Sequence, residues 1–256
     1  PNEYFAGLKA PARLMRLREK VSALTALGVD QILCLRFDQS FAALSAEDFV
    51  QTILLEGLGV KHLVIGDDFR FGHQRLGDFQ LLVAMGQAHG FTVAAMPTQS
   101  HEQGRISSTA VRAALAQGNM SQAAQLLGRD FSMSGKVAHG HKRGRMIGFP
   151  TANIHLHRQV VPVQGIFVVQ VYGLAESPVN GVANVGNRPI IADPRTLLEV
   201  HLFDFNREIY GEQVQVVFLK KLRDEAHYDN FDELKAQIMQ DAAQAQAFFR
   251  QQASNS

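Results

Sequence analysis

The sequence predicts an α/β domain with a parallel sheet, followed by an antiparallel β-barrel domain that ends in a helix. In residues 11–127, segments with helical apolar spacing alternate with short continuous apolar runs, which is typical of βαβ units. After Gly128, short strand-like runs are separated by Gly, Pro, Asn and Asp, which is typical of an antiparallel barrel or sandwich. We therefore expect two domains, at residues 1–127 and 128–256.

The first domain is expected to alternate helix and strand. We expect helices at residues 11–28, 46–59 and 77–90, and strands at residues 29–37, 60–65 and 91–97. Three strands are few for an open α/β sheet, which usually has about five or six. Because the series starts on a helix and the chain opens on Pro1, we expect this domain to be incomplete at its N-terminus.

The second domain is expected to consist of short strands and one helix. The expected strands are residues 132–140, 164–173, 181–186, 196–205 and 212–222. The helix is expected at residues 232–250, and its apolar stripe is formed by Leu234, Ile238, Ala242, Ala245 and Phe249. Asn230 and Glu233 resemble a capping box at its start.

The composition excludes several classes of protein. A net charge of +1, from 25 basic and 24 acidic side chains, argues against a nucleic-acid binder that relies on broad phosphate neutralisation. No apolar run approaches ~18 residues and no signal peptide opens the chain, so we expect a cytoplasmic protein without a membrane span. The single cysteine, Cys34, excludes an internal disulfide framework and is expected to be a buried residue of the strand at 29–37.

The segment GDDFRFG follows an expected parallel strand, where open α/β sheets bind ligands. Gly66 allows close backbone approach, and Asp67 or Asp68 is a candidate for a ribose or a ligand amine. Phe69 and Phe71 are candidates to flank a planar ring. The alternative is a turn whose two aromatic side chains belong to the core.

The segment GRISSTAVRAAL is a candidate phosphate site. Ser107, Ser108 and Thr109 open a helix, and Arg112 lies one turn on, beside Ser108. Helix N-terminal amides, hydroxyls and a guanidinium then converge on one spot. The alternative is a simple N-cap, which serine often provides.

The segment from Gly135 to Asn153 fits a flap over a polyphosphate, because it combines glycines with basic side chains. Thr151 and Asn153 supply hard oxygen ligands of the kind that Mg²⁺ accepts beside phosphates and water. The alternative is a polar start to a strand. The candidate ATP and phosphate contacts are Gly135, Lys136, His139, Gly140, Arg145, Gly148, Pro150, Thr151 and Asn153.

A group that orients or deprotonates a substrate hydroxyl is offered by TLLEVHLFDF. Strand alternation puts Glu199 and His201 on one face with Leu197, Phe203 and Phe205. A carboxylate among apolar neighbours is costly unless it has a task or a partner. The alternative is a Glu–His pair at a solvated rim.

Together these segments resemble the bacterial bifunctional riboflavin kinase/FAD synthetase family. GDDFRFG and ISSTAVR match the G-x-D-F-x-F-G and I-S-S-T-x-x-R segments of its nucleotidyltransferase (Rossmann-like) FMN adenylyltransferase domain. GFPTAN matches the G-x-P-T-A-N motif of riboflavin kinases, and Glu199 stands in their E-x-H context. The resemblance implies that Thr151 and Asn153 bind Mg²⁺ and ATP phosphates, and that Glu199 is the catalytic base.

Two further segments resemble the flavin side of the family's kinase domain. GVANVGNRP contains Asn184 and Arg188, and LRDEAHYDNF contains Arg223, Glu225 and Phe231. The family's H-x-G-H motif, which binds ATP phosphates for adenylyl transfer, has no match here. The sequence HGH at 139–141 lacks the spacing, and RFGH at 70–73 has arginine in place of the first histidine.

The resemblance implies ATP-dependent phosphorylation of riboflavin to FMN, with Mg²⁺. In the complete protein it also implies adenylylation of FMN to FAD with release of pyrophosphate. Two alternatives stay open at this point. The first is a riboflavin kinase with a non-catalytic nucleotide- or flavin-binding first domain, and the second is a flavin- or nucleotide-binding module without turnover. In each case the partners are small molecules, not a nucleic acid or a membrane.

Overall fold

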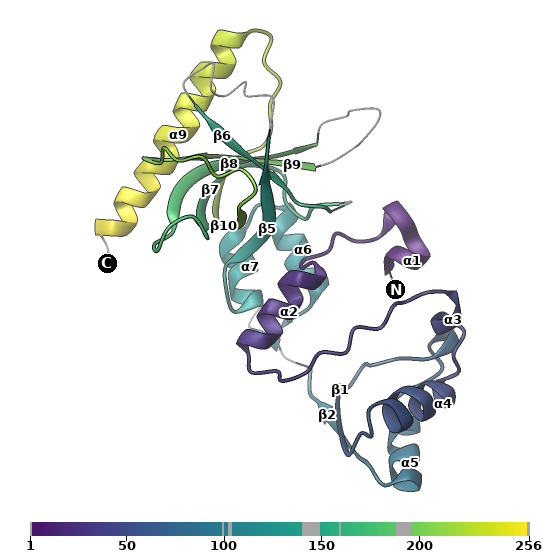
Figure 1. Cartoon of the computed structure of the whole chain (residues 1–256). Helices are drawn as coiled ribbons and strands as arrows, with labels where there is room; N and C mark the ends of the chain where they lie inside the picture. Colours follow the sequence, from purple (N-terminus) through teal and green to yellow (C-terminus); the bar gives the residue numbers. More distant parts are fainter. Residues whose placement is uncertain are drawn as a thin grey trace. The chain divides into compact units, whose positions relative to one another are not determined.

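The chain forms two compact units in the computed structural model. The structure describes residues 2–98, 100–101, 104–139, 149–158, 160–187 and 196–254. One unit, here called the α/β unit, consists of Pro1–Ala10 and Gln31–Ile106, and the other, here called the barrel unit, consists of Pro11–Asp30 and Ser107–Ser256 (Figure 1). Each unit is described on its own.

The α/β unit is built around a parallel βαβ motif. Strand β1 (His62–Gly66) pairs in parallel with β2 (Thr92–Met96), and α5 (Phe79–His89) connects them. Asp78 caps α5, since its side chain accepts a hydrogen bond from the Leu81 amide. The other elements are α1 (Asn2–Ala6), η1 (Gly7–Lys9), α3 (Gln39–Ala42), α4 (Ala46–Phe49), the π-helix η2 (Val50–Gly57), η3 (His73–Arg75), β3 (Ser100–His101) and β4 (Gly104–Arg105).

The expected helices and two of the expected strands of this half are confirmed. The core of the α/β unit is made by buried side chains of α4, η2, α5 and their connections, namely Ala46, Val50, Leu54, Phe71, Leu82 and Phe91. The helix expected at residues 11–28 is α2 (Leu17–Ala26), which lies in the barrel unit and is followed by Gly28 with φ of 82°.

The strand expected at residues 29–37 is wrong. This segment has no regular secondary structure, and Leu33 and Leu35 are 56% and 41% exposed. Cys34, expected to be buried, is exposed as well. A strand forms only where a neighbouring strand takes its backbone hydrogen bonds, and in the part of the chain that the structure describes β1 and β2 pair only with each other.

The barrel unit contains a closed six-stranded antiparallel barrel with the strand order β10-β5-β6-β9-β8-β7. Closure leaves no free strand edge, and alternate side chains of each strand point into the barrel interior. Apolar side chains fill the interior, among them the buried residues Met133, Phe167, Leu198, Val200 and Phe218. The strands are β5 (Phe131–Ala138), β6 (Thr151–His155), β7 (Gly165–Tyr172), β8 (Val179–Asn187), β9 (Thr196–Leu202) and β10 (Gln213–Arg223).

Three helices of the first half of the sequence belong to the barrel unit. Helices α6 (Ser108–Ala116) and α7 (Met120–Leu127) share one core with the barrel, in which Leu115 and Ala123 are buried with Phe131. Helix α2 is the third. The expected domain boundary between residues 127 and 128 stays a prediction. The two units are defined by how compactly the chain packs, whereas the expected boundary separates two sequence patterns.

The C-terminal helix α9 (Phe231–Ser254) lies along the outer face of the barrel (Figure 1). Ala242 and Ala245 of the expected stripe are buried there with Ile166, Val168 and Val182 of the barrel strands. Asn230 caps the helix, because its side chain accepts from the Glu233 amide at 2.9 Å; Glu233 accepts in return from the Asn230 side-chain amide at 2.7 Å, where a capping box would use the backbone amide. None of the helices that the structure describes is long and apolar enough to cross a bilayer.

A buried ion pair fastens α2 to the barrel. Arg158, whose side chain is 1% exposed, donates from Nη2 to Glu19 Oε2 at 2.5 Å. Glu19 Oε1 also accepts from the Ser134 amide of β5 at 2.7 Å. Burial lowers the pKa of Arg158, and the Glu19 carboxylate opposes that effect. Neither charge is tolerated at this depth without the other.

We expect Glu19→Gln to destabilise the barrel unit by about 3 kcal/mol, because Arg158 would stay buried without a counter-charge. Urea-induced unfolding followed by circular dichroism measures this. The control is Glu212→Gln, which removes the surface pair with Arg207, whose partners are 53% and 33% exposed, and should change stability by less than about 1 kcal/mol. Equal losses in the two variants would contradict the assignment.

Candidate active site

A row of polar side chains crosses three neighbouring strands on the outer face of the barrel. Glu199 of β9 is the register partner of Asn153 on β6 and of Asn184 on β8. Register partners in antiparallel strands have their side chains on the same face. The flanking residues Ile154 and Leu198 are buried in the barrel interior, so the row Asn153–Glu199–Asn184 faces outward. Sequence analysis named all three residues, and the barrel register brings them together.

The polar row is partly shielded from solvent. Asn153 is 9% exposed, and Glu199 is half-buried. Asn184 is half-buried as a whole, yet its Oδ1 atom is fully buried and has no hydrogen-bond partner within the described part of the chain. A carboxylate between two amides, on a rigid sheet and partly out of water, is suited to accept a proton from a substrate hydroxyl.

Thr151 and His201 form a second row beside the first. They are register partners on β6 and β9, two residues along each strand from Asn153 and Glu199. His201 Nδ1 lies 2.9 Å from the Pro150 carbonyl oxygen, which can only accept, so Nδ1 is the donor. The rings of Phe149 and Phe203 pack edge-to-face against His201, with centroids at 5.0 and 5.6 Å. His201 is thus held in place by its neighbours.

Hard oxygen atoms for a divalent cation come from β6. Thr151 and Asn153 are two residues apart on one strand, so their oxygen-bearing side chains share a face. Within the described residues, no three His, Cys, Asp or Glu side chains gather to hold a metal ion. Two neutral protein oxygens fit Mg²⁺ that arrives with phosphate and retains water molecules, because Mg²⁺ rarely needs an all-protein site.

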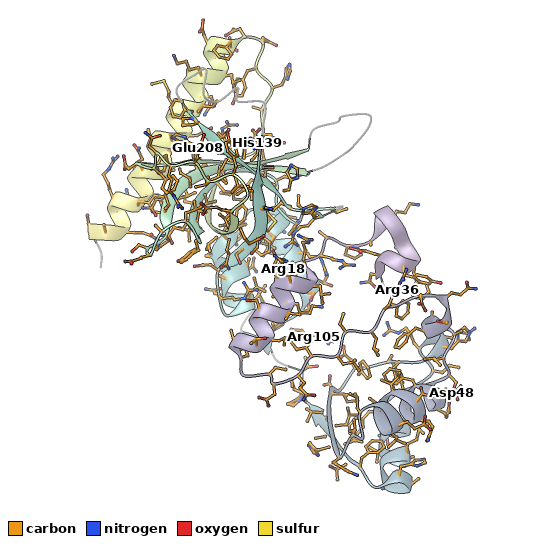
Figure 2. All side chains as sticks on the ribbon, viewed as in Figure 1. Arg18, Arg36, Asp48, Arg105, His139 and Glu208 are labelled. Carbon is orange, nitrogen blue, oxygen red and sulfur yellow. The ribbon has the colours of Figure 1, made fainter. Side chains whose placement is uncertain are left out.

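The start of the expected flap is ordered by β5. Gly135 admits no side chain, since a Cβ atom there would lie 2.5 Å from the His155 carbonyl oxygen on β6. Lys136 is exposed, and the ring of His139 (labelled in Figure 2) stacks on Tyr210 with centroids 3.9 Å apart. Gly140, Arg145 and Gly148 lie outside the described residues.

Arg223, at the end of β10, binds the C-terminal helix. Its Nε and Nη2 donate to the two carboxylate oxygens of Asp241 at 2.9 and 2.7 Å, and Nη1 donates to the Asp224 carbonyl at 2.9 Å. The hydrogen bond to Asp241 raises the pKa of Arg223. Asp241 is 4% exposed and also accepts from Gln237 at 3.0 Å. Arg223 is therefore a clamp between β10 and α9.

Sequence analysis missed Asp241. The signal was present, because Asp241 stands three residues after Ile238 and four before Ala245, on the apolar stripe of α9. A carboxylate at such a position needs a cationic partner, and Arg223 is that partner.

The segment after β10 reaches the polar row. A Cβ atom at Gly186 would clash with Glu225 Oε1, so the Glu225 carboxylate lies against the backbone of β8. Gly186 is two residues beyond Asn184 on the same face. Phe231, the third residue predicted in this segment, is 56% exposed. Arg188 lies outside the described residues.

In the α/β unit, the two aspartates after β1 have partners within the unit. Asp67 accepts from the Thr98 hydroxyl at 2.9 Å and from the Thr98 amide at 3.2 Å, while Asp68 forms an ion pair with Arg105 (labelled in Figure 2). The hydrogen bond from Arg105 lowers the pKa of Asp68. These contacts order the segment that starts at Gly66.

The two aromatic residues of the same segment differ in burial. Phe71 is 6% exposed and belongs to the core, whereas Phe69 is 40% exposed and stacks on Phe71 with ring centroids 5.6 Å apart. Both border a cavity of about 820 Å³. Its other aromatic lining residues are Tyr4, Phe5, Phe37, Phe41 and Phe49. A planar ring in this cavity would contact Phe69 more readily than Phe71, because Phe71 is buried in the core.

The hydroxyl segment opens α6 in the barrel unit. Ser107 is the N-cap and accepts from the Ala110 amide at 3.2 Å. Ser108 and Thr109 follow in the first turn, and Arg112 Nε donates to the Ala12 carbonyl at 2.7 Å. Ser107 thus has the capping role weighed as the alternative, while the hydroxyls of Ser108 and Thr109 are not needed for the cap.

Two family models match the chain. The riboflavin kinase model matches residues 127–249, and the FAD synthetase model matches residues 1–110. A crystal structure of a macrolide-efflux protein from Streptococcus pneumoniae is similar to this chain, with a TM-score of 0.75 and 34% identity, and the match covers 89% of this chain and 73% of that one.

Relatives with a stated enzymatic activity match over nearly the whole chain. A bifunctional riboflavin kinase/FMN adenylyltransferase from Escherichia coli strain K12 is 53% identical over 97% of this chain and 80% of its own length. The protein of the same name from Haemophilus influenzae is 48% identical over 97% of this chain and 81% of its own length. The chain therefore belongs to the family of bifunctional riboflavin kinases/FMN adenylyltransferases.

Proposed function

We propose that this chain transfers the γ-phosphoryl group of ATP to the ribityl 5′-hydroxyl of riboflavin, which gives FMN and ADP. The observation that carries the proposal is the row Asn153–Glu199–Asn184 beside Thr151 on one face of the barrel. It places a proton acceptor next to oxygen ligands for a metal–phosphate complex. Since the reaction uses ATP, we place it in the cytoplasm.

In this reaction the hydroxyl oxygen attacks the γ-phosphorus as the bond to the β-phosphate oxygen breaks. Glu199 accepts the hydroxyl proton, and Thr151 and Asn153 are the residues that would hold a metal ion together with the phosphates. When bound there, Mg²⁺ neutralises the charge on the phosphate oxygens. The remaining flap residues contribute backbone amides and positive charge along the triphosphate; they are Gly135, Lys136, His139, Gly140, Arg145, Gly148 and Pro150. Catalysis is then mostly positioning plus charge stabilisation.

The flavin side of the kinase site is supported by the segment after β10. Glu225 lies against β8 near Asn184, and Arg223 fixes the segment to α9 through Asp241. We infer that Asn184, Arg188, Glu225 and Phe231 contact the flavin. Arg223 is inferred to orient the segment, since Nε and Nη2 bind Asp241 and Nη1 binds the Asp224 carbonyl.

The companion reaction is adenylyl transfer from ATP to FMN, which gives FAD and pyrophosphate. Ser108, Thr109 and Arg112 are inferred to bind phosphate at the start of α6, with Ser107 as the cap that orders the turn. In the α/β unit, Phe69 and the neighbouring cavity are inferred to take a planar ring. Gly66 allows the backbone to approach the ligand, and Asp67 and Asp68 order the segment. The missing H-x-G-H motif favours the second candidate, a kinase without adenylyl transfer in this chain.

A time course of flavins tests these functions together. We expect the chain, incubated with riboflavin, ATP and Mg²⁺, to form FMN and little FAD, because its 256 residues contain no H-x-G-H motif. Separation of the flavins by chromatography is the measurement. FAD that forms at a rate close to that of FMN would overturn our view of that motif. Riboflavin left unchanged by a folded sample would exclude the kinase.

We expect Glu199→Gln to lower kcat for FMN formation by about 10²–10⁴-fold, because the amide cannot accept the hydroxyl proton. The KM for ATP should change little. The matched control is Glu176→Gln, an exposed carboxylate on the β7–β8 connection, at the opposite end of that hairpin from Asn184. A kcat within a few-fold of the parent's would remove Glu199 from the role of base.

We expect Thr151→Val to raise the Mg²⁺ concentration needed for half-maximal kinase rate by about tenfold or more, because one oxygen ligand is lost while the shape is kept. Excess Mg²⁺ should restore part of the rate. Titration of the initial rate with Mg²⁺ measures this. A variant with a lower rate and an unchanged Mg²⁺ requirement would assign Thr151 to another role.

A further inference from the structure

Asn184 presents a buried acceptor that has no donor. Its Oδ1 atom is inaccessible to solvent and has no hydrogen-bond partner among the residues that the structure describes. Such groups are few in native proteins, and each calls for an explanation. Asn180, on the same strand and the same face, shows the ordinary case, because its Oδ1 accepts from Gln170 Nε2 at 3.1 Å.

The immediate neighbours of Asn184 cannot supply the donor. Its register partners are Ile166 on β7 and Glu199 on β9. Along β8, the residues that share its face are Val182 and Gly186. Of these four, three have no polar side-chain atom, and a carboxylate such as that of Glu199 only accepts. None of these four neighbours supplies the donor, so the acceptor is available to a hydroxyl of a bound ligand.

The position of this acceptor identifies the part of the ligand that would meet it. Asn184 and Glu199 are direct cross-strand neighbours, whose Cβ atoms lie about 4.5–5.5 Å apart. Two acceptors side by side on one rigid face match two hydroxyls on adjacent carbons. Building on the proposed kinase function, we propose that Asn184 Oδ1 accepts a hydrogen bond from the 4′-hydroxyl of the ribityl chain, while Glu199 receives the proton of the 5′-hydroxyl.

An amide suits this position better than the obvious alternative acceptor. An aspartate would put a second carboxylate directly opposite Glu199, and like charges at paired positions repel. The amide oxygen accepts the same hydrogen bond without that repulsion. Asn184 is thus a specificity-determining residue that selects a polyol chain over a simple terminal alcohol.

The test compares riboflavin with 4′-deoxyriboflavin, which keeps the 5′-hydroxyl. We expect the parent chain to prefer riboflavin in kcat/KM by about 10- to 100-fold, because the deoxy substrate leaves the buried acceptor unpaired. In Asn184→Ala the activity toward riboflavin should fall and that toward the deoxy analogue should not, so that the ratio approaches one. Asn180→Ala is the control and should keep the parent ratio.

Two further readouts separate this role from a structural one. In the absence of flavin, Asn184→Val should raise the unfolding temperature or leave it unchanged, since it removes an unpaired buried polar atom. A structural asparagine would instead show a lower unfolding temperature. The dissociation constants of both flavins, from quenching of flavin fluorescence, should show the same loss of preference in the variants.

The outcomes distinguish the two proposals. If the ratio for Asn184→Ala stays at the parent value while both substrates lose activity equally, the contact with the 4′-hydroxyl is overturned. If riboflavin binds without being phosphorylated, the kinase function fails. The contact is then decided by the binding ratio alone, which supports it when Asn184→Ala abolishes the preference and overturns it otherwise.

Discussion

The register of strand β9 within the closed barrel is the constraint on which the kinase site depends. Glu199 faces outward between Asn153 and Asn184 only because Leu198 and Val200 on either side of it point into the barrel interior. A slip of one residue would put the carboxylate into an apolar core and leucine or valine on the outer face. In a closed sheet such a slip would disrupt the pairing on both sides of the strand, so the apolar core also fixes the position of the proton acceptor.

One part of the outer face of the barrel packs against helix α9, and another part carries the polar row of the candidate active site. Helix α9 covers Ile166, Val168 and Val182 with its alanines, and this apolar contact leaves the row that includes Glu199 at its border. The bidentate pair of Arg223 with Asp241 adds a directional, charge-assisted link at the same border. Because the segment with Glu225 begins directly after this clamp, the position of the helix and that of the flavin-side segment are coupled.

How well the sequence predicts the fold and the site depends on how far apart in the sequence the interacting residues lie. Thr151, Asn153 and Glu199 were identifiable from short motifs and strand alternation, which act over a few residues. The prediction of a strand at 29–37 was wrong, because a continuous apolar run does not reveal whether a partner strand is present. The Glu19–Arg158 pair joins residues 139 positions apart, and no local pattern predicts such a pairing. Asn184 was named from its motif, but only the strand register shows that it lies directly beside Glu199.

The packing of α6 has a consequence for the adenylyl transfer half of the family's chemistry. Ser108 and Thr109 stand on a helix whose buried residues, Val111 and Leu115, lie in the same core as the barrel side chains Phe131 and Phe218. A helix of nine residues is not stable by itself in water. The start of α6, with its hydroxyls and Arg112, is therefore held in shape by the barrel core. Sequence matches assign this helix start to the FAD synthetase model, which ends at residue 110, but its support comes from the barrel unit.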